Sequence, residues 1–190
     1  MTKKTEDLSK LWSEVCMGNQ YSYSLIHQKL YPSLYAYGNR MLNDCELADD
    51  VIQEMFIKLW LRRESIGPIG NVKAYFFAVA RSTCLDSIKS RGSVEVKKTK
   101  IEFLDLEIST EEKITQWETT LKQKKVIEFA LNQLPARQQE IMRLRFFEDM
   151  NCSEIAAATG IKYQSVVNHM YRSIQTLREL YVSEDELRVA

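Results

Sequence analysis

The C-terminal third of the chain alternates apolar and polar positions as two short helices joined by a turn. Asn151 and Glu154 form a capping box that starts the first helix, and Gly160 ends it. The second helix has apolar residues at helical spacing, at Val166, Met170, Ile174 and Leu177. This pattern over Cys152–Leu177 predicts a helix-turn-helix, whose second helix lies in the DNA major groove. Its outward positions can hydrogen-bond bases or phosphates, and they are Gln164, Ser165, Asn168, His169 and Arg172.

The N-terminal half shows the same helical periodicity. Apolar positions predict helix over Leu8–Leu42, with a break at Gly18 and Asn19. Pro32 should bend the second of these helices or start a new one, because proline lacks the amide hydrogen that the helix needs. Asp44 follows in a turn and can cap the next helix.

Residues 45–63 give the clearest helix of this half, with an apolar face at Ala48, Ile52, Met55, Phe56 and Leu59. Ile57 and Trp60 fall outside that face. Either the buried face is broad, or these two side chains belong to a protein-docking surface. Residues 64–71 contain two glycines and a proline and predict a loop.

The next predicted helix, residues 72–90, interleaves aromatic and basic side chains. Buried positions are expected at Tyr75, Phe76, Val79, Ala80, Thr83 and Ile88, and basic residues stand at Lys73, Arg81, Lys89 and Arg91. This combination is typical of single-stranded nucleic-acid binding, in which rings stack on bases and cations hold phosphates. The alternative, which the sequence alone favours, is that Tyr75, Phe76 and Phe77 are core residues.

The middle of the chain changes character. Residues 101–108 alternate apolar and acidic positions, which fits a short strand or an extended linker; we prefer the linker, since no partner strand is evident. A capping box at Ser109 and Glu112 predicts a helix to Asn132. Pro135 then starts a helix over 136–147, with buried residues expected at Ile141, Met142 and Leu144.

These elements predict an all-α protein of two helical domains. We expect a first domain over residues 1–92, a linker over 93–122, a helix-turn-helix domain over 123–182 and an acidic tail over 183–190. The formal net charge is zero, but residues 72–100 and 120–145 are basic whereas 39–60 and 101–119 are acidic. Such alternation indicates separate surfaces, two of them for polyanionic partners, or simply uneven solvated helix faces.

Cofactor and enzyme signals are missing from the sequence. Cys16, Cys45, Cys84 and Cys152 are far apart and reduced thiols are expected. The two histidines, His27 and His169, have no partner at metal-ligand spacing. Neither a catalytic Cys–His pair nor a phosphate-binding glycine loop occurs. The polar N-terminus has no apolar signal core and no apolar run could span a membrane, so we expect a cytoplasmic, non-enzymatic protein without cofactor, metal or small-molecule substrate.

Three segments resemble one family. LADDVIQEMFIKLW, residues 47–60, resembles the most recognisable motif of sigma-70 factors, especially the extracytoplasmic-function group. Residues 74–91 are similar to that family's promoter-melting helix, and residues 134–179 to its C-terminal domain. The resemblance implies a two-domain sigma factor that binds core RNA polymerase and directs promoter recognition, melting and transcription initiation. The alternative is a free-standing helix-turn-helix repressor or activator.

The resemblance also implies roles for residues. Core polymerase would bind Asp49, Asp50, Gln53, Glu54, Phe56, Lys58 and Trp60. The melted −10 element would contact Asn71, Lys73, Tyr75, Phe76, Arg81, Ser82, Lys89 and Arg91. The duplex −35 element would contact Lys162, Tyr163, Gln164, Ser165, Asn168, His169 and Arg172.

This sequence departs from the family pattern at positions that would read the DNA bases, namely Ser82, Lys162, Tyr163 and Ser165. The promoter preferences of the family are therefore not expected to apply to this protein. The family also implies an anti-sigma factor as a partner, often membrane-anchored, while the chain itself does not insert in the membrane.

Overall fold

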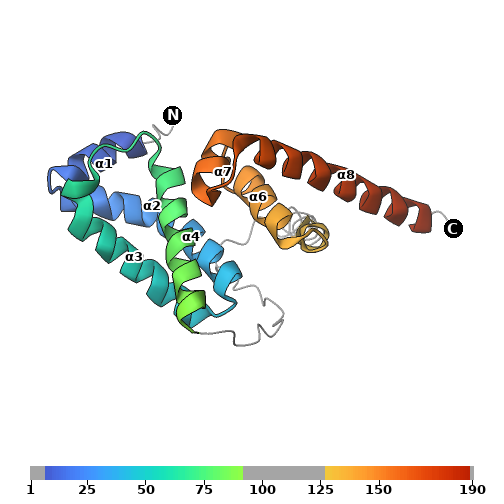
Figure 1. Ribbon diagram of the computed structural model, residues 1–190, viewed down its shortest axis with the longest axis horizontal. Helices are drawn as coiled ribbons and strands as arrows, with labels where there is room; N and C mark the ends of the chain where they lie inside the picture. Colours follow the sequence, from blue (N-terminus) through green and yellow to red (C-terminus); the bar gives the residue numbers. More distant parts are fainter. Residues whose placement is uncertain (1–6, 92–126, 189–190) are drawn as a thin grey trace, which may run out of the picture. The chain divides into compact units, whose positions relative to one another are not determined.

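The computed structural model describes residues 7–91 and 127–188, with side chains described as far as residue 180. Within these ranges the regular structure is α-helix and no strand occurs, so the predicted all-α class is confirmed (Figure 1). The alternating segment 101–108 and the capping box at Ser109 lie outside the described residues. Their interpretation as linker and helix start therefore stays a prediction.

The helices belong to two compact units. The N-terminal unit consists of α1 (Leu8–Cys16), α2 (Gln20–Leu42), α3 (Cys45–Ile66) and α4 (Val72–Ser90), which pack against one another. In the C-terminal unit, α6 (Ala136–Phe146) packs along α8 (Tyr163–Arg188), and a helical segment at residues 127–132 precedes α6. Between them in sequence comes α7 (Cys152–Thr159). The predicted domain boundaries stay predictions.

Short polar side chains fix where the helices of the N-terminal unit begin. The side chains of Asp7, Asn19, Asp44 and Asn71 each accept a hydrogen bond from a backbone amide in the first turn of the helix that follows. Such caps satisfy amide groups that have no partner inside the helix. The predicted break at Gly18, where φ is +91°, and the predicted cap at Asp44 are thus confirmed.

Two helix ends differ from the sequence-based expectations, and no new helix begins at Pro32. α2 runs unbroken through Pro32, which is exposed on the helix surface, while Ile26, Leu30 and Leu34 on its other side are buried. Tertiary packing on both sides of the proline therefore outweighs its lost hydrogen bond. α3 continues into the predicted loop and ends at Gly67, whose φ of +67° favours glycine. α8 continues to Arg188, through most of the predicted tail.

The core of the N-terminal unit centres on Trp12. This side chain is fully buried, its ring packs edge-on against Phe76 with centroids 5.6 Å apart, and its Nε1 donates a 2.8 Å hydrogen bond to the Gly67 carbonyl. The bond ties α1 to the connection between α3 and α4. The buried face of α3 contains all the predicted residues, namely Ala48, Ile52, Met55, Phe56 and Leu59. On α4, however, Ile88 is 42% exposed, and Cys84 is buried in its place.

The C-terminal unit has its own small core. The predicted burial of Ile141, Met142 and Leu144 is confirmed. Leu131, Leu134 and Met142 form a cluster on which Ile174 and Leu177 of α8 pack. Sequence reasoning missed that Arg143 is also buried. Its guanidinium binds both carboxylate oxygens of Glu128 and lies 3.3 Å from the Asn132 side-chain oxygen, so it joins α6 to the preceding helical segment.

The four cysteines are free, and their burial predicts an order of reactivity. Burial raises the pKa of the Cys84 thiol to about 11, whereas Cys45 is exposed. The thiolate is the reactive form, so we expect iodoacetamide to modify Cys45 in native buffer and Cys84 only after denaturation. Peptide mass spectrometry distinguishes the two. Equal rates at both cysteines in native buffer would show that the core opens readily around α4.

Candidate functional site

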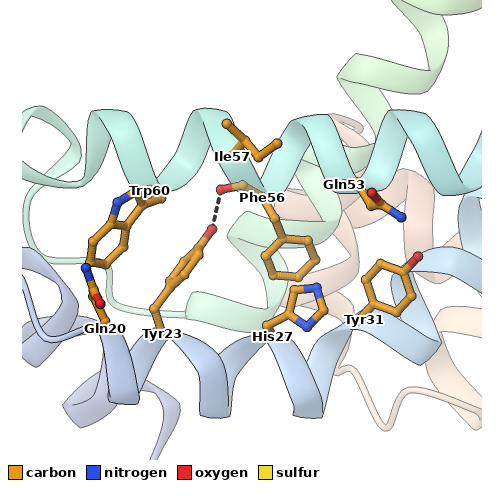
Figure 2. Close-up of a pocket in the computed structure, with 8 residues that line it drawn as sticks. All are labelled: Gln20, Tyr23, His27, Tyr31, Gln53, Phe56, Ile57 and Trp60. Carbon is orange, nitrogen blue, oxygen red and sulfur yellow. Dashed lines mark hydrogen bonds between the residues drawn. The ribbon is translucent and has the colours of Figure 1, made fainter.

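A groove lined by aromatic side chains follows the line along which α2 packs on α3. It has a volume of about 560 Å³, and Figure 2 shows its walls. One wall comes from α2 and consists of Gln20, Tyr23, His27 and Tyr31. The other comes from α3 and consists of Gln53, Phe56, Ile57 and Trp60. Spacings of three and four residues place each set on one face of its helix.

A hydrogen bond and ring contacts hold the Trp60 end of the groove in place. The Tyr23 hydroxyl donates to the Phe56 carbonyl, and its ring lies 5.2 Å from that of Trp60 (Figure 2). The Arg63 guanidinium lies over the Trp60 ring, 4.4 Å from its centroid. Burial raises the pKa of Tyr23, so its hydroxyl keeps the proton that it donates. The indole of Trp60 is therefore clamped, with one part accessible from the groove.

At the other end of the groove, aromatic side chains lie beside an acidic one. His27 stacks on Tyr31 with centroids 4.8 Å apart and touches Phe56 at 4.6 Å. Burial lowers the pKa of His27, so the imidazole is neutral at pH 7. The Tyr31 hydroxyl and the Gln53 amide, at 2.8 Å, both donate to the carboxylate of Asp49. This network fixes the polar rim of the groove.

A second candidate surface lies along α4. Ser82, Lys89 and Arg91 are exposed, while Tyr75 is partly buried and Phe76 fully buried. Arg91 pairs with Asp44 at 3.2 Å and Lys89 with Asp86 at 3.6 Å. The backbone amide of Leu47, and then Arg91, lower the pKa of the Asp44 carboxyl. Exposed ion pairs of this kind contribute little stability, so both cations can exchange their carboxylate for another anion.

A third surface lies at the start of α8. Gly160, with φ at +69°, ends α7, and the Lys162 carbonyl accepts the first amides of α8 from Ser165 and Val166. The exposed residues of the first turns are Lys162, Tyr163, Gln164, Asn168, Tyr171 and Arg172. Val166 is fully buried on the opposite side. This end of α8 thus presents a polar face with hydrogen-bonding groups of several kinds.

No group of residues that could hold a metal ion occurs in the described part of the chain. Nor is any helix within it long and apolar enough to cross a membrane.

Comparison with known proteins finds one family for both halves of the chain. Residues 26–94 match the family model for sigma-70 region 2, and residues 124–177 match the model for sigma-70 region 4. The chain is 28% identical over 137 residues to the RNA polymerase sigma factor SigV of Bacillus subtilis, which covers 72% of this chain and 76% of that protein. It is 26% identical over 146 residues to the ECF RNA polymerase sigma factor SigL of Mycobacterium tuberculosis. This alignment covers 76% of this chain and 80% of SigL.

The chain belongs to the extracytoplasmic-function group of the sigma-70 family. It is therefore a sigma factor, and its function is promoter recognition and transcription initiation. Sigma factors are regulatory initiation factors and not enzymes.

Two solved structures have the same fold as this sigma factor. CnrH in complex with the cytosolic domain of CnrY matches with a TM-score of 0.63 at 17% identity, over 93% of this chain and 99% of that one. The sigma factor RpoE in complex with the anti-sigma factor NepR, from Bartonella quintana, matches with a TM-score of 0.60 at 20% identity. This match covers 84% of this chain and 96% of the RpoE chain.

The outer face of α3 falls within the region 2 match, and so does the groove except for Gln20 and Tyr23, which precede it. Of the residues expected to bind core polymerase, Asp50, Gln53, Glu54 and Lys58 are exposed and Trp60 is partly buried. Glu54 and Lys58 pair with each other at 2.7 Å. Phe56 is only 3% exposed, so it supports the groove as its floor.

One residue expected to contact DNA is placed elsewhere by the structure. Phe76 has no exposed surface, because its ring packs against Trp12 and Phe56 in the core of the N-terminal unit. The expectation that it stacks on a base is wrong for this structure, and the alternative that it is a core residue holds. Asn71 uses its side-chain oxygen to cap α4 through the Ala74 amide, at 2.8 Å.

The sequence analysis missed the α2 wall of the groove. Tyr23, His27 and Tyr31 were not considered as site residues, although their spacing along α2 is regular. A stripe of amphipathic rings beside an apolar helix face was the available signal. Its meaning depends on pairing with α3, which spacing within α2 does not reveal.

Proposed function

We propose that the sigma factor binds core RNA polymerase through the outer face of α3 and the groove beside it. The observation that carries this proposal is the combination of exposed apolar and acidic side chains within the region 2 match. Ile57 is 59% exposed and Trp60 is accessible from the groove, and the exposed carboxylate of Asp50 lies two turns before Ile57 on the same helix. Exposed apolar groups rimmed by polar ones are typical of protein interfaces, in which aromatic anchors dominate the binding energy.

The other two surfaces are proposed to contact promoter DNA. On α4, the cations of Lys73, Arg81, Lys89 and Arg91, together with Ser82, Tyr75 and Asn71, would hold the melted −10 strand. Tyr75, partly accessible, is the aromatic residue left to stack on an unpaired base. On α8, the face that contains Lys162, Tyr163, Gln164, Ser165, Asn168, His169 and Arg172 would read the −35 duplex. Gln164 and Asn168 lie 3.3 Å apart through their amides, a pair of groups suited to adenine edges.

Replacing Arg172 by alanine should weaken promoter binding by the polymerase holoenzyme about ten-fold if the guanidinium contacts a base or phosphate. The slope of the logarithm of the binding constant against the logarithm of the salt concentration should also become shallower by about one, because one fewer counterion is released. Fluorescence anisotropy with a labelled promoter fragment measures both quantities. Arg178→Ala is the control, since Arg178 is exposed on α8 beyond the proposed reading face. Unchanged affinity and salt slope in Arg172→Ala would remove Arg172 from the interface.

An anti-sigma factor is the proposed regulatory partner. The solved structures of similar fold are complexes, one of CnrH with the cytosolic domain of CnrY and one of RpoE with the anti-sigma factor NepR. By analogy, a membrane-anchored anti-sigma factor would cover the polymerase-binding face of this protein until a signal releases it. The place of action would be the cytoplasm, where promoter DNA and polymerase meet.

One binding experiment separates this function from that of a free-standing helix-turn-helix regulator. A labelled promoter fragment is titrated with the chain alone and with the chain plus core polymerase. We expect specific binding only when core polymerase is present, because few residues of α8 read the duplex. Binding of equal affinity without polymerase would favour the independent regulator.

A further inference from the structure

Side chains of α1 hold the connection between α3 and α4. The carbonyl oxygen of Gly67, where α3 ends, accepts the 2.8 Å hydrogen bond from Nε1 of Trp12, and Sγ of Cys16 lies 3.5 Å from the same oxygen. The Cys16 sulfur lies equally close to the carbonyl oxygen of Arg63, one turn earlier in α3. α1 itself packs against both α3 and α4 (Figure 1). Both donors precede residues 26–94, the range that matches the region 2 model.

Gly67 needs support from outside, because glycine restricts its own backbone very little. Its φ of +67° and ψ of −160° fall in a region that is essentially confined to glycine, and a glycine can leave that region at little cost. Pro68 follows, and its ring fixes its φ. The direction in which the chain leaves Gly67 therefore sets the path of the next residues. A hydrogen bond to the Gly67 carbonyl fixes the peptide plane from which that path starts.

The middle of the connection extends into open space. Pro68 and Gly70 are exposed, and a Cβ added at Gly70 would meet no atom within 4 Å beyond its chain neighbours. The chain is anchored again at Asn71, which caps α4 through the Ala74 amide, and at the buried Val72. The placement of Asn71 therefore depends on both ends of this short connection, and α1 holds the first of them.

Trp12 also reaches α4 through its ring. The indole packs edge-on against Phe76, and the Phe76 ring in turn lies 6.5 Å from the ring of Tyr75, centroid to centroid. Tyr75 is the partly accessible ring of the proposed −10 face. One buried side chain thus contacts both the start of the connection and the ring that neighbours Tyr75.

We propose that α1 positions the −10 face of this sigma factor. Trp12 and Cys16 hold the Gly67 carbonyl, and through it they fix Asn71 and Tyr75 in the arrangement that selects an unpaired base. Both are positioning residues, because one is buried, the other is half-buried, and they act through groups that lie between them and the DNA. The inference rests on the proposed −10 role of α4 and adds to it an element outside the three proposed surfaces.

Trp12→Phe is the main test, because phenylalanine keeps a ring in the core and removes the donor to Gly67. Holoenzyme containing each variant is given a promoter that the wild-type holoenzyme uses, with its −10 element randomised, and the fragments recovered in open complexes are sequenced. We expect the base preference at the unpaired −10 positions to fall about five-fold in Trp12→Phe. Its affinity for core polymerase should stay within about two-fold of wild type.

Ile26→Val is the matched control, because Ile26 is fully buried in α2 and the change costs stability without removing a hydrogen-bonding group. At a temperature at which circular dichroism shows both variants folded, this control should keep the wild-type base preference. A purely structural Trp12 would make the two variants alike. The inference is overturned if Trp12→Phe changes the preference no more than Ile26→Val does, or if its core affinity falls as far as its preference.

Cys16→Ala keeps the inference testable if Trp12→Phe does not fold. The substitution removes the second donor from a half-buried position and should lower the base preference about two-fold, in the same direction. If Trp12→Phe is unfolded and Cys16→Ala keeps the wild-type preference, the positioning role of α1 is rejected.

Tyr75→Ala separates this inference from the proposed function. If the Tyr75→Ala holoenzyme keeps the wild-type base preference, the proposed −10 face itself is wrong. If Tyr75→Ala loses the preference while Trp12→Phe and Cys16→Ala keep it, the −10 face stands and only the positioning role of α1 is wrong.

Discussion

Replacing Trp12 by alanine is expected to lower the free energy of unfolding of the N-terminal unit by about 3–5 kcal/mol. The indole is fully buried, so the substitution leaves a cavity beside Phe76. It also leaves the Gly67 carbonyl without the 2.8 Å hydrogen bond from Nε1. Because Gly67 ends α3 and leads into α4, the loss should loosen the connection between the proposed polymerase-binding face of α3 and the proposed −10 face of α4.

Urea denaturation followed by circular dichroism measures this effect. Trp12→Phe is the informative comparison, because it keeps an aromatic ring in the core and removes the hydrogen-bond donor. The free energy of unfolding of Trp12→Phe should fall by about 1–2 kcal/mol more than that of a surface control variant. This decrease should be clearly smaller than the one caused by Trp12→Ala. A loss below about 1 kcal/mol in Trp12→Ala would contradict the central position of this side chain.

Replacing Trp60 by alanine is expected to weaken core polymerase binding about thirty-fold, equivalent to about 2 kcal/mol. The side chain is pre-organised for binding, since Tyr23 packs on its ring and Arg63 lies over it. A partner that contacts it therefore loses little conformational entropy. Helicity should be unchanged, because Trp60 lies beside the buried face of α3.

Arg62→Ala is the matched control for this variant, as Arg62 is an exposed neighbour on the same helix. It should bind core polymerase within about two-fold of wild type. If Trp60→Ala bound core polymerase with wild-type affinity, the indole would be excluded from the interface. The carboxylates of α3 would then be the next residues to test.

The helices were predictable from the sequence where local chemistry decides. Asn19 and Asp44 cap the helices that follow them, and Gly18 and Gly160 adopt the positive φ angles for which glycine is suited. Pro32 was not predictable in this way. A proline disfavours helix locally, yet buried residues on both sides of it keep α2 continuous.

The site was predictable only in part, for a related reason. Periodicity separated Ile57 from the buried face of α3, and the structure shows it exposed. Periodicity does not say which of several consecutive rings turns inward, so Phe76 was assigned to DNA although it is buried. Likewise, a charged residue such as Arg143 is expected at the surface, and its burial depends on Glu128, fifteen positions away.

The most direct test of the whole account is run-off transcription with purified core polymerase on a library of genomic promoter fragments. Core polymerase with this protein should produce discrete promoter-specific transcripts, and neither component alone should do so. The Trp60→Ala and Arg172→Ala variants should reduce those transcripts without changing their start sites. Absence of any specific transcript across the library, together with tight promoter binding by the protein alone, would contradict the assignment as a sigma factor.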